Sequence, residues 1–220
     1  MFRMSHAVAF AALAAFGAST HAAIINGGFE QPNQGFHSVQ PGQTYGNWTC
    51  AGPSDIEFVH AEPNASLPNL QFSAYEGEYW IDLCGVGLAS AIYQDILSLN
   101  AGDVYNISFA QSGNVWGPNF NFVMNVLWNN AVVGTFSSVQ GGNDGTQMNW
   151  QVRGVDVVAQ SGTNRLTFQA VTAISARGPA IDDVSMTLVP APSGFGLICA
   201  GAVLAGRRHR TQCWPAALAG

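Results

Sequence analysis

The chain has 220 residues, a mean hydropathy of +0.14 and a formal net charge of −6 at pH 7. It contains no lysine, and the segment from Ile24 to Leu188 has three arginines against all thirteen acids, which gives it a formal charge of −10. A surface this acidic repels nucleic acid and anionic membranes, and it is compatible with divalent cations and neutral sugars.

Residues 1–22 have the pattern of a secretory signal peptide. Arg3 stands near the start, an apolar stretch follows from Ala7 to Ala18, and a small residue, Ala22, ends the segment. A positive start, an apolar run and a small-residue cleavage site are the three parts of such a signal. We predict cleavage after Ala22, with Ala23 as the alternative, and therefore an exported protein.

The next 165 residues, Ile24 to Leu188, are long enough for one domain with its own core. Alternation of apolar and polar residues with period two, typical of half-buried strands, occurs in 79–83, 103–111, 122–128, 165–171 and 184–188. Turn-forming pairs follow at 129–130, 141–142, 144–145 and 161–162. No long apolar period of 3.6 occurs, so we predict ten to twelve short strands in an all-β jelly-roll sandwich.

Cys50 and Cys84 are the two cysteines of this domain. In an oxidising compartment they are expected to form a disulfide, which would stabilise the fold by about 3–4 kcal/mol in the chain-entropy model. The alternative is two independent buried thiols. The other two cysteines, Cys199 and Cys213, lie in the C-terminal tail.

Aromatic side chains among amides are the usual ingredients of a sugar site, because a sugar presents flat C–H faces and many hydroxyls. The loop after the stretch 103–111 provides the best candidate, with Trp116 between Asn114 and Asn119. A second candidate is Trp80 with Asp82, which alternate with the apolar residues of the stretch 79–83. We expect Trp48 and Trp128 to belong to the core.

Three acids could hold calcium near the two ends of the domain. Glu30 closes the first expected strand motif, and Asp182 and Asp183 begin the last strand. The ends of a jelly roll are often adjacent, and carboxylates that meet there would make a hard-oxygen site suited to Ca²⁺. The alternative is that these acids face solvent or accept backbone N–H groups in turns.

No catalytic motif is present. The predicted mature domain keeps only two histidines, His37 and His60, and it has no G-x-S-x-G, H-E-x-x-H or P-loop sequence. A pair of carboxylates is all that a glycosidase requires. The acids available for such a pair are Glu57, Glu62, Glu76, Glu78 and Asp82. We predict a protein without enzymatic activity, with a weak glycoside hydrolase as the remaining alternative.

The C-terminal segment 189–210 has a proline motif, a short apolar run from Phe195 to Gly206 and an arginine cluster. The motif and the cluster consist of Val189, Pro190, Ala191, Pro192, Arg207, Arg208 and Arg210. As a helix the run would reach about 18 Å, against a hydrocarbon core of ~30 Å. The segment resembles the PEP-CTERM sorting signal, which implies cleavage by an exosortase at the inner membrane. Ala191 stands where that family usually has Glu, and residues 211–220 follow the arginines as a tail. An ordinary short anchor or a buried helix are the alternatives.

A second resemblance covers most of the domain. The motifs that carry it, in order, are NGGFE at 26–30, AYEGEYWIDL at 74–83, AIYQ at 91–94, AGDVYNISF at 101–109 and GPAIDDV at 178–184. They resemble the DUF-642 and choice-of-anchor domains, which implies a galactose-binding-like β-sandwich related to carbohydrate-binding modules and without catalysis. Related modules carry a structural calcium, so the resemblance also points to the acids near the domain ends.

These observations predict a protein of the cell envelope or surface, or a secreted one, that binds extracellular polysaccharide. A structural or adhesive matrix protein without a sugar site is the second hypothesis, and a weak hydrolase is the third. An exposed tryptophan beside amides favours the first. Tryptophans that are all buried, together with a large exposed apolar patch, favour the second. Two acids that face each other in a cleft, one with a raised pKa, favour the third.

Overall fold

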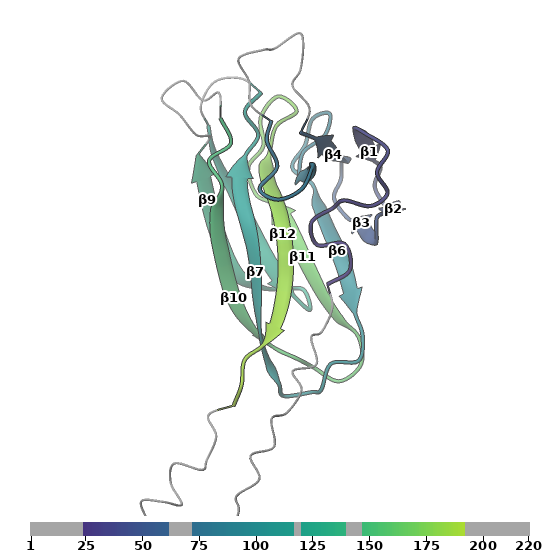
Figure 1. Cartoon of the computed structure of the whole chain (residues 1–220), viewed down its shortest axis with the longest axis vertical. Coiled ribbons are helices and arrows are strands. Elements are labelled where there is room, and N and C mark those ends of the chain that lie inside the picture. Colours follow the sequence, from purple (N-terminus) through teal and green to yellow (C-terminus); the bar gives the residue numbers. More distant parts are fainter. Residues whose placement is uncertain (1–23, 62–71, 117–119, 140–146, 192–220) are drawn as a thin grey trace, which may run out of the picture. The chain divides into compact units, whose positions relative to one another are not determined.

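The structure is a computed structural model that describes residues 24–61, 72–116, 120–139 and 147–191 (Figure 1). These residues form twelve strands and no helix. The strands are β1 (His37–Val39), β2 (Thr44–Tyr45), β3 (Trp48–Cys50), β4 (Ile56–His60), β5 (Tyr79–Asp82), β6 (Ala91–Ile96), β7 (Val104–Gly113), β8 (Asn121–Trp128), β9 (Ala131–Val139), β10 (Gln151–Val158), β11 (Asn164–Ala170) and β12 (Pro179–Leu188). The predicted all-β fold and number of strands are confirmed.

The strands form two antiparallel six-stranded sheets. Sheet A has the order β1-β4-β5-β12-β7-β10, and sheet B has the order β2-β3-β6-β11-β8-β9. The last strand of the chain, β12, therefore lies inside sheet A, paired with β5 on one side and β7 on the other. Figure 1 shows the long strands β7, β10 and β12 side by side. The result is the predicted jelly-roll sandwich.

The main core fills the space between the sheets, and the period-two pattern of the sequence predicts its members well. In β7 the side chains of Tyr105, Ile107 and Phe109 are buried, as expected for one face of a strand. In β8 the same holds for alternate residues from Phe122 to Trp128. Trp48 is also fully buried, as predicted, and its indole N–H donates to the carbonyl of Asn26 at 3.0 Å.

One predicted turn shows the expected chemistry clearly. Asn129 and Asn130 join β8 to β9, with φ of 50° and 67°. A two-residue hairpin turn of type I′ requires positive φ at both positions, and asparagine tolerates that conformation better than most residues. The turn at Gly162 also has a positive φ, of 84°. The pairs at 141–142 and 144–145 lie outside the described residues.

A second, smaller apolar cluster covers part of the outer face of sheet A. It contains Trp80, Phe72, Val115 and Ala180. In β5, Tyr79 and Ile81 point into the main core while Trp80 belongs to this outer cluster, so all four residues of the strand are buried. The outer face of β5 is therefore covered by loops and not open to solvent.

The two ends of the domain are adjacent, as predicted. The N–H of Val184 donates to the carbonyl of Gly27 at 2.9 Å, so the turn before Glu30 lies against β12. Val189 to Ala191 follow β12 without regular structure. The rest of the predicted sorting segment (residues 192–210), the tail (211–220) and the predicted signal peptide (1–22) lie outside the described residues. Within the described part of the chain, no helix is long and apolar enough to cross a membrane.

The structure contradicts the predicted disulfide. Cys50 and Cys84 are both buried free thiols. Cys50 ends β3 in sheet B, where its Sγ contacts the carbonyl of Ser54 at 3.3 Å, whereas Cys84 follows β5 of sheet A, and its Sγ lies 3.9 Å from the carbonyl of Gly85. Each thiol therefore packs with its own neighbours, which is the alternative that the sequence left open.

Candidate ligand-binding pocket

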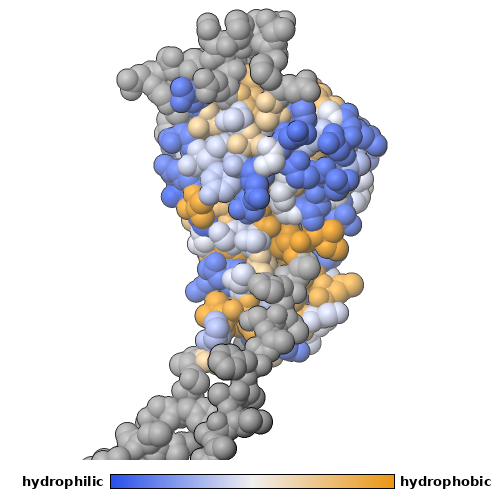
Figure 2. All heavy atoms as spheres, in the orientation of Figure 1, coloured by the Kyte–Doolittle hydropathy of each residue, from blue (hydrophilic) through white to orange (hydrophobic). Residues whose placement is uncertain are grey.

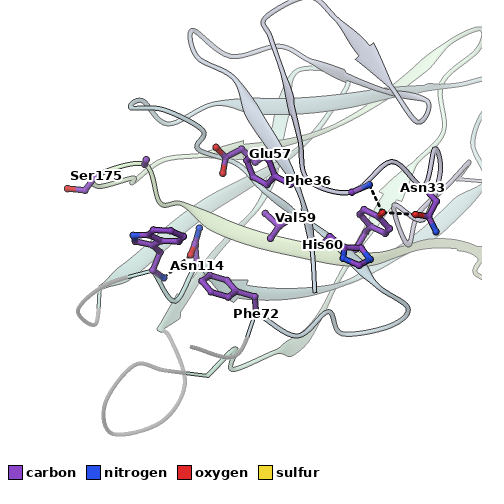
Figure 3. A pocket seen from close by; sticks show the side chains of 12 residues that line it. Asn33, Phe36, Glu57, Val59, His60, Phe72, Asn114 and Ser175 are labelled. Carbon is purple, nitrogen blue, oxygen red and sulfur yellow. Dashed lines mark hydrogen bonds between the residues drawn. The ribbon is translucent and has the colours of Figure 1, made fainter. Parts of the chain in front are cut away.

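A pocket of about 670 Å³ lies on sheet A and is drawn in Figure 3. Six segments form its walls: the loop before β1, strand β4, the segment before β5, strand β5, the loop after β7, and the turn before β12. Its lining consists of Asn33, Gly35, Phe36, Glu57, Val59, His60, Phe72, Tyr79, Asn114, Trp116, Ser175 and Ala176. The volume is in the range of sites for small ligands, which is roughly 300–1,000 Å³.

Two large aromatic side chains of the pocket are exposed. Trp116 is 53% exposed and Phe36 is 60% exposed. Trp116 is not loose, because its ring lies 6.0 Å from the ring of Phe72, which belongs to the outer cluster. Apolar rings held open to solvent beside polar groups are suited to stack on the C–H face of a sugar. The predicted role of Trp116 as a ligand platform is compatible with this placement.

Asn114 holds the loop that carries Trp116. Its amide Nδ2 donates a short hydrogen bond to Asp82 Oδ2, and its Oδ1 accepts the backbone N–H of Trp116 at 2.9 Å. Asn114 is 5% exposed, so most of its side chain is covered although it contributes to the pocket wall. Through these two contacts, Asn114 connects Asp82 of β5 to the backbone of Trp116, whose indole is exposed. Asn119, the third residue predicted for this site, lies outside the described residues.

The other predicted platform, Trp80 with Asp82, is wrong as a ligand site. Both side chains have no exposed surface, because loops cover the outer face of β5. The indole N–H of Trp80 donates to the carbonyl of Phe72 at 3.0 Å, and Asp82 accepts hydrogen bonds from Asn114 and from the N–H of Cys84. Period two identifies the face on which these residues lie, but not the loops that return to cover it.

Glu57 is the acid that the pocket exposes. It lies on β4, directly opposite Asp82 of β5 in the strand register, and is half-buried. Burial, together with the charge of Asp55, raises the pKa of Glu57 to about 7. Burial also raises the pKa of Asp82 well above its usual range. Two carboxyls opposite each other cannot both ionise easily away from water, so this part of sheet A favours bound protons.

Asp55 behaves differently although it is also buried. Burial pushes its pKa upward, but hydrogen bonds from Ser38, from the N–H of Val86 and from Ser54 outweigh that effect and lower the pKa. The carboxylate form is therefore favoured at Asp55, and its charge acts on Glu57 two residues along the strand. The negative charge of Asp55 thus lies close to Glu57 of the pocket lining.

Polar groups continue along one wall of the pocket. The Tyr79 hydroxyl donates to Asn33 Oδ1 and accepts the N–H of Gly35, each at 2.8 Å (Figure 3). His60 of β4 lies directly opposite Tyr79 in the strand register. The centre of its ring is 4.7 Å from that of Tyr79, and its Nε2 is 3.4 Å from Glu78 Oε2. Amide, hydroxyl and imidazole groups on one side thus face apolar rings on the other.

The turn before β12 completes the pocket. Ser175 and Ala176 have φ of 51° and 60°, and the backbone groups of Ile174 and Arg177 bond to each other across the turn at 2.9 and 3.1 Å. For a residue such as alanine this left-handed conformation costs about 1–2 kcal/mol, so the closed turn and its packing must hold it. The wall is therefore built as a tight, fixed turn.

The carboxylate pair does not have the arrangement that hydrolysis requires. Glu57 faces the pocket, but its partner Asp82 has no exposed surface and is not among the lining residues. A glycosidase needs both carboxyls in contact with the substrate or with the attacking water. Among the twelve lining residues Glu57 is the only carboxylate. The described lining therefore presents one carboxyl and no second group for this reaction, and Glu62, another acid considered from the sequence, lies outside the described residues.

The predicted calcium ligands bind the backbone of one loop. Glu30 Oε1 accepts the N–H groups of Glu78 and Tyr79 at 2.9 and 3.1 Å. Asp182 Oδ2 accepts those of Tyr75 and Glu76 at 2.8 and 3.1 Å. Gly77, between them, has a φ of 65°, and a Cβ at this position would lie 2.2 Å from Glu30 Oε1. The two acids therefore hold the loop 75–79 from both of its ends.

This arrangement fits a cation only in part. Within the described residues, no group of three or more His, Cys, Asp and Glu side chains is placed to hold a metal. Glu30 Oε2 and the Asp183 carboxylate accept no hydrogen bond from the described residues, so those oxygens are the ones that would remain for a hard cation. Calcium stays a prediction for Glu30, Asp182 and Asp183, and acceptance of backbone N–H groups is the role that the structure gives to Glu30 and Asp182.

The sequence did not identify most of the pocket. Phe36, Asn33, Tyr79 and the turn at Ser175 were not expected to contribute, and Glu57 was considered only as one of several acids. Its signal was present, since Ile56 and Phe58 of β4 point into the core and Glu57 must then face outward. The signal for Phe36 was an aromatic residue in a polar, glycine-containing loop.

Comparison with solved structures finds several carbohydrate-binding domains of low sequence identity. No family model matches the chain. A carbohydrate-binding module, TmCBM61, solved in complex with β-1,4-galactotriose, is 17% identical, with a TM-score of 0.49 over 78% of this chain and 100% of that one. A family 35 carbohydrate-binding module from Clostridium thermocellum is 16% identical, with a TM-score of 0.41 over 70% and 98%. The CBM22-1 xylan-binding domain from Paenibacillus barcinonensis is 14% identical, with a TM-score of 0.42 over 71% and 94%.

A curated protein also matches part of the sequence. The multifunctional-autoprocessing repeats-in-toxin protein of Vibrio cholerae serotype O1 is 33% identical over 98 residues. These residues are 44% of this chain, and the chain spans only 2% of the toxin's length. We therefore infer the function from the pocket itself.

Proposed function

We propose that the domain binds a sugar unit of an extracellular polysaccharide in the pocket on sheet A, without catalysis. One observation carries the proposal: two aromatic rings, those of Trp116 and Phe36, are more than half exposed at a pocket that also presents a carboxyl, an imidazole and an amide. Rings that cannot be buried lose favourable burial energy unless a ligand covers them. Sugars match this combination of flat apolar faces and hydroxyl groups.

The competing hypotheses predict other arrangements. A matrix protein without a sugar site was expected to bury all its tryptophans and to expose a large apolar patch. Trp116 is exposed, and on the face shown in Figure 2 hydrophobic residues lie in separate groups among polar ones. A hydrolase was expected to present two acids to one cleft, and Asp82 is covered. Both features favour binding in the pocket.

We also propose that the chain is exported and that its C-terminal segment is a sorting signal. The support is the sequence alone: the pattern of residues 1–22, and the order of proline motif, apolar run and arginine cluster in 189–210. An exosortase would be the partner of that segment, with brief contact to the inner membrane. Export brings an acidic, lysine-free domain to the envelope or the cell surface, where neutral polysaccharides are available.

The test of sugar binding is a broad glycan array probed with the purified protein, its Trp116→Ala variant and its Phe36→Ala variant. We expect each variant to weaken binding by about tenfold or more, because removing the ring removes its apolar contact with the sugar face, and the comparable stacking of a nucleic-acid base on an aromatic ring is worth about 1–3 kcal/mol. Tyr75→Ala is the matched control, because Tyr75 is 44% exposed and does not line the pocket. It should bind like the wild type.

A folded protein that binds nothing on the array would contradict the proposal. So would binding that Tyr75→Ala weakens as much as Trp116→Ala does, because the ligand would then lie elsewhere on the surface. Thermal unfolding of each variant separates a lost contact from a lost fold. Trp116→Ala should leave stability almost unchanged, since more than half of the side chain is already in water.

A further inference from the structure

We propose that the sugar bound in this pocket carries a positive charge, as a glycan with free amino groups does, and that its ammonium pairs with Glu57. This inference rests on the proposed sugar-binding function and specifies the class of sugar. Its basis is an imbalance in the pocket: a half-buried carboxyl faces the cavity, and nothing in the described structure neutralises it.

The carboxyl of Glu57 has no hydrogen-bond partner among the described residues. The neighbouring acids differ, since Asp55 accepts bonds from Ser38, Ser54 and the N–H of Val86. Asp82 accepts bonds from Asn114 and the N–H of Cys84. An ionised carboxyl that is partly removed from water is costly unless it is paired or hydrogen-bonded. Glu57 is therefore the one carboxyl of this cluster that has no partner within the described part of the chain.

The charges around Glu57 are mostly negative. The titratable groups that interact with Glu57 or line the same cavity are Asp55 just before β4, His60 of β4, Tyr79 and Asp82 of β5, and Cys84 after β5. Glu78 Oε2 lies 3.4 Å from His60 Nε2 and does not line the cavity. Arg177 is 3% exposed, and the charge of Asp82 acts on its guanidinium. No arginine or lysine is among the twelve lining residues.

A cation in the ligand resolves this imbalance, and a neutral hydroxyl does not. An ammonium beside Glu57 would favour the carboxylate form, in the same way that an opposite charge within hydrogen-bond distance favours ionisation of any acid. The bond would be charge-assisted, and such bonds are shorter and about twice as strong as neutral ones. The carboxylate of Asp55 would add attraction and no repulsion.

The walls fit the rest of such a sugar. Trp116 and Phe36 are exposed rings that can cover the C–H face of a pyranose, and the face of an indole also attracts a nearby cation. Val59 lies between Glu57 and His60 on β4 and forms part of the apolar lining (Figure 3). An amino sugar presents one apolar face and one cationic corner, which matches apolar walls around a single unpaired carboxyl.

The experiment is calorimetric titration of the whole protein with matched pairs of oligosaccharides. Glucosamine and galactosamine trisaccharides with free amines are compared with the same trisaccharides fully N-acetylated, at about pH 6 and about pH 7.5. We expect the free amines to bind about tenfold or more tighter, which corresponds to one charge-assisted contact. At the lower pH, where the sugar amine is already protonated before it binds, titration in two buffers of different ionisation enthalpy should show proton release on binding, since the ligand drives Glu57 to its ionised form.

Two variants decide the role of Glu57. Glu57→Gln should remove both the preference for free amines and the proton release, while binding of the N-acetylated sugars changes little. Glu78→Gln is the control: this carboxylate is exposed, lies near His60 and does not line the pocket, so both effects should remain.

Equal affinity for the two members of each pair in the wild type would overturn the inference and leave sugar binding intact. So would a preference for amines that Glu57→Gln retains, or proton uptake in place of release, because a protonated Glu57 would then be donating to a neutral sugar. A folded protein that binds neither member of any pair, and no neutral glycan on the array, would instead contradict the proposed function itself.

Discussion

Asp182, which is fully buried, and Glu57, which is half-buried, are two acids of sheet A with almost the same titration behaviour and different surroundings. Burial raises the pKa of each to about 7. Asp182 accepts the backbone N–H groups of Tyr75, Glu76 and Asp183, which oppose the effect of burial. Glu57 accepts none from the described residues. A raised pKa therefore does not distinguish a structural acid from a ligand-binding one, whereas the count of hydrogen bonds does.

The largest expected difference between the two acids is in stability. Asp182→Ala should lower the free energy of unfolding by about 3 kcal/mol or more, because it leaves three N–H groups without their acceptor and each buried unpaired group costs about 1–3 kcal/mol. Urea unfolding measures this. Asp183→Asn is the control, since the Asp183 side chain accepts no bond from the described residues and asparagine also tolerates its φ of 46°. A loss as small as that of the control would show that the loop 75–79 does not depend on Asp182.

Glu57 should behave in the opposite way, with an effect that depends on pH. Its carboxyl keeps a proton in the folded state up to about pH 7, while in the unfolded chain it loses the proton near 4.5. The folded state therefore binds more protons between these values, and stability falls as the pH rises through that window. Glu57→Gln removes this loss, so the variant should be more stable than the wild type by roughly 1 kcal/mol at about pH 8, after allowance for solvent screening, and equal at about pH 4.

Unfolding of both proteins by urea across this range tests the prediction. Comparison with the wild type isolates Glu57, because Asp182 makes the same contribution to both curves. A constant difference at every pH would mean that the carboxyl of Glu57 is solvated in the folded protein. The inference about a cationic ligand would then lose its premise.

The third expected effect concerns calcium at the other acid cluster, and its size depends on the concentration of Ca²⁺. If Ca²⁺ binds at Glu30, Asp182 and Asp183, a concentration 100 times its Kd should stabilise the protein by about 2.7 kcal/mol, and lower concentrations by less. Thermal unfolding with Ca²⁺, with Mg²⁺ and with a chelator measures this. Glu30→Gln keeps an oxygen acceptor for the N–H groups of Glu78 and Tyr79, and should remove the response to Ca²⁺ with little change in the chelated protein. An unchanged melting temperature at millimolar Ca²⁺ would leave these acids with a structural role alone.

The sandwich could be predicted because the alternation of apolar and polar residues within a strand shows which of its faces packs on the core. In β7 and β8 each second residue is apolar, and those residues are the buried ones. β5 shows where this reasoning ends. Trp80 and Asp82 lie on the face predicted for them, but Phe72, Val115 and Trp150, which lie outside the strands of sheet A, pack over that face. The alternation of residues within a strand does not show which other segments of the chain will pack over its outer face.

The pocket was less predictable for the same reason. Trp116 could be proposed as exposed from its neighbours alone, since turn formers and amides surround it. Phe36, Glu57 and Ser175 belong to segments more than a hundred residues apart at their extremes, and only the order of strands in sheet A brings them together. The free cysteines follow this pattern too, because compartment and spacing favour a bond that the positions of Cys50 and Cys84 in the two sheets do not provide.

The position of β12 has a consequence for how the chain folds. Without residues 179–188, sheet A consists of two separate pieces, β1-β4-β5 and β7-β10, and Glu30 holds the loop 75–79 from one end only. Pairings between the start and the end of a chain form late, because closing long loops costs entropy before any contact compensates for it. If the chain crosses a membrane from its N-terminus, sheet A would thus remain incompletely folded until nearly the whole chain had passed through. An incompletely folded chain can pass through a narrow channel.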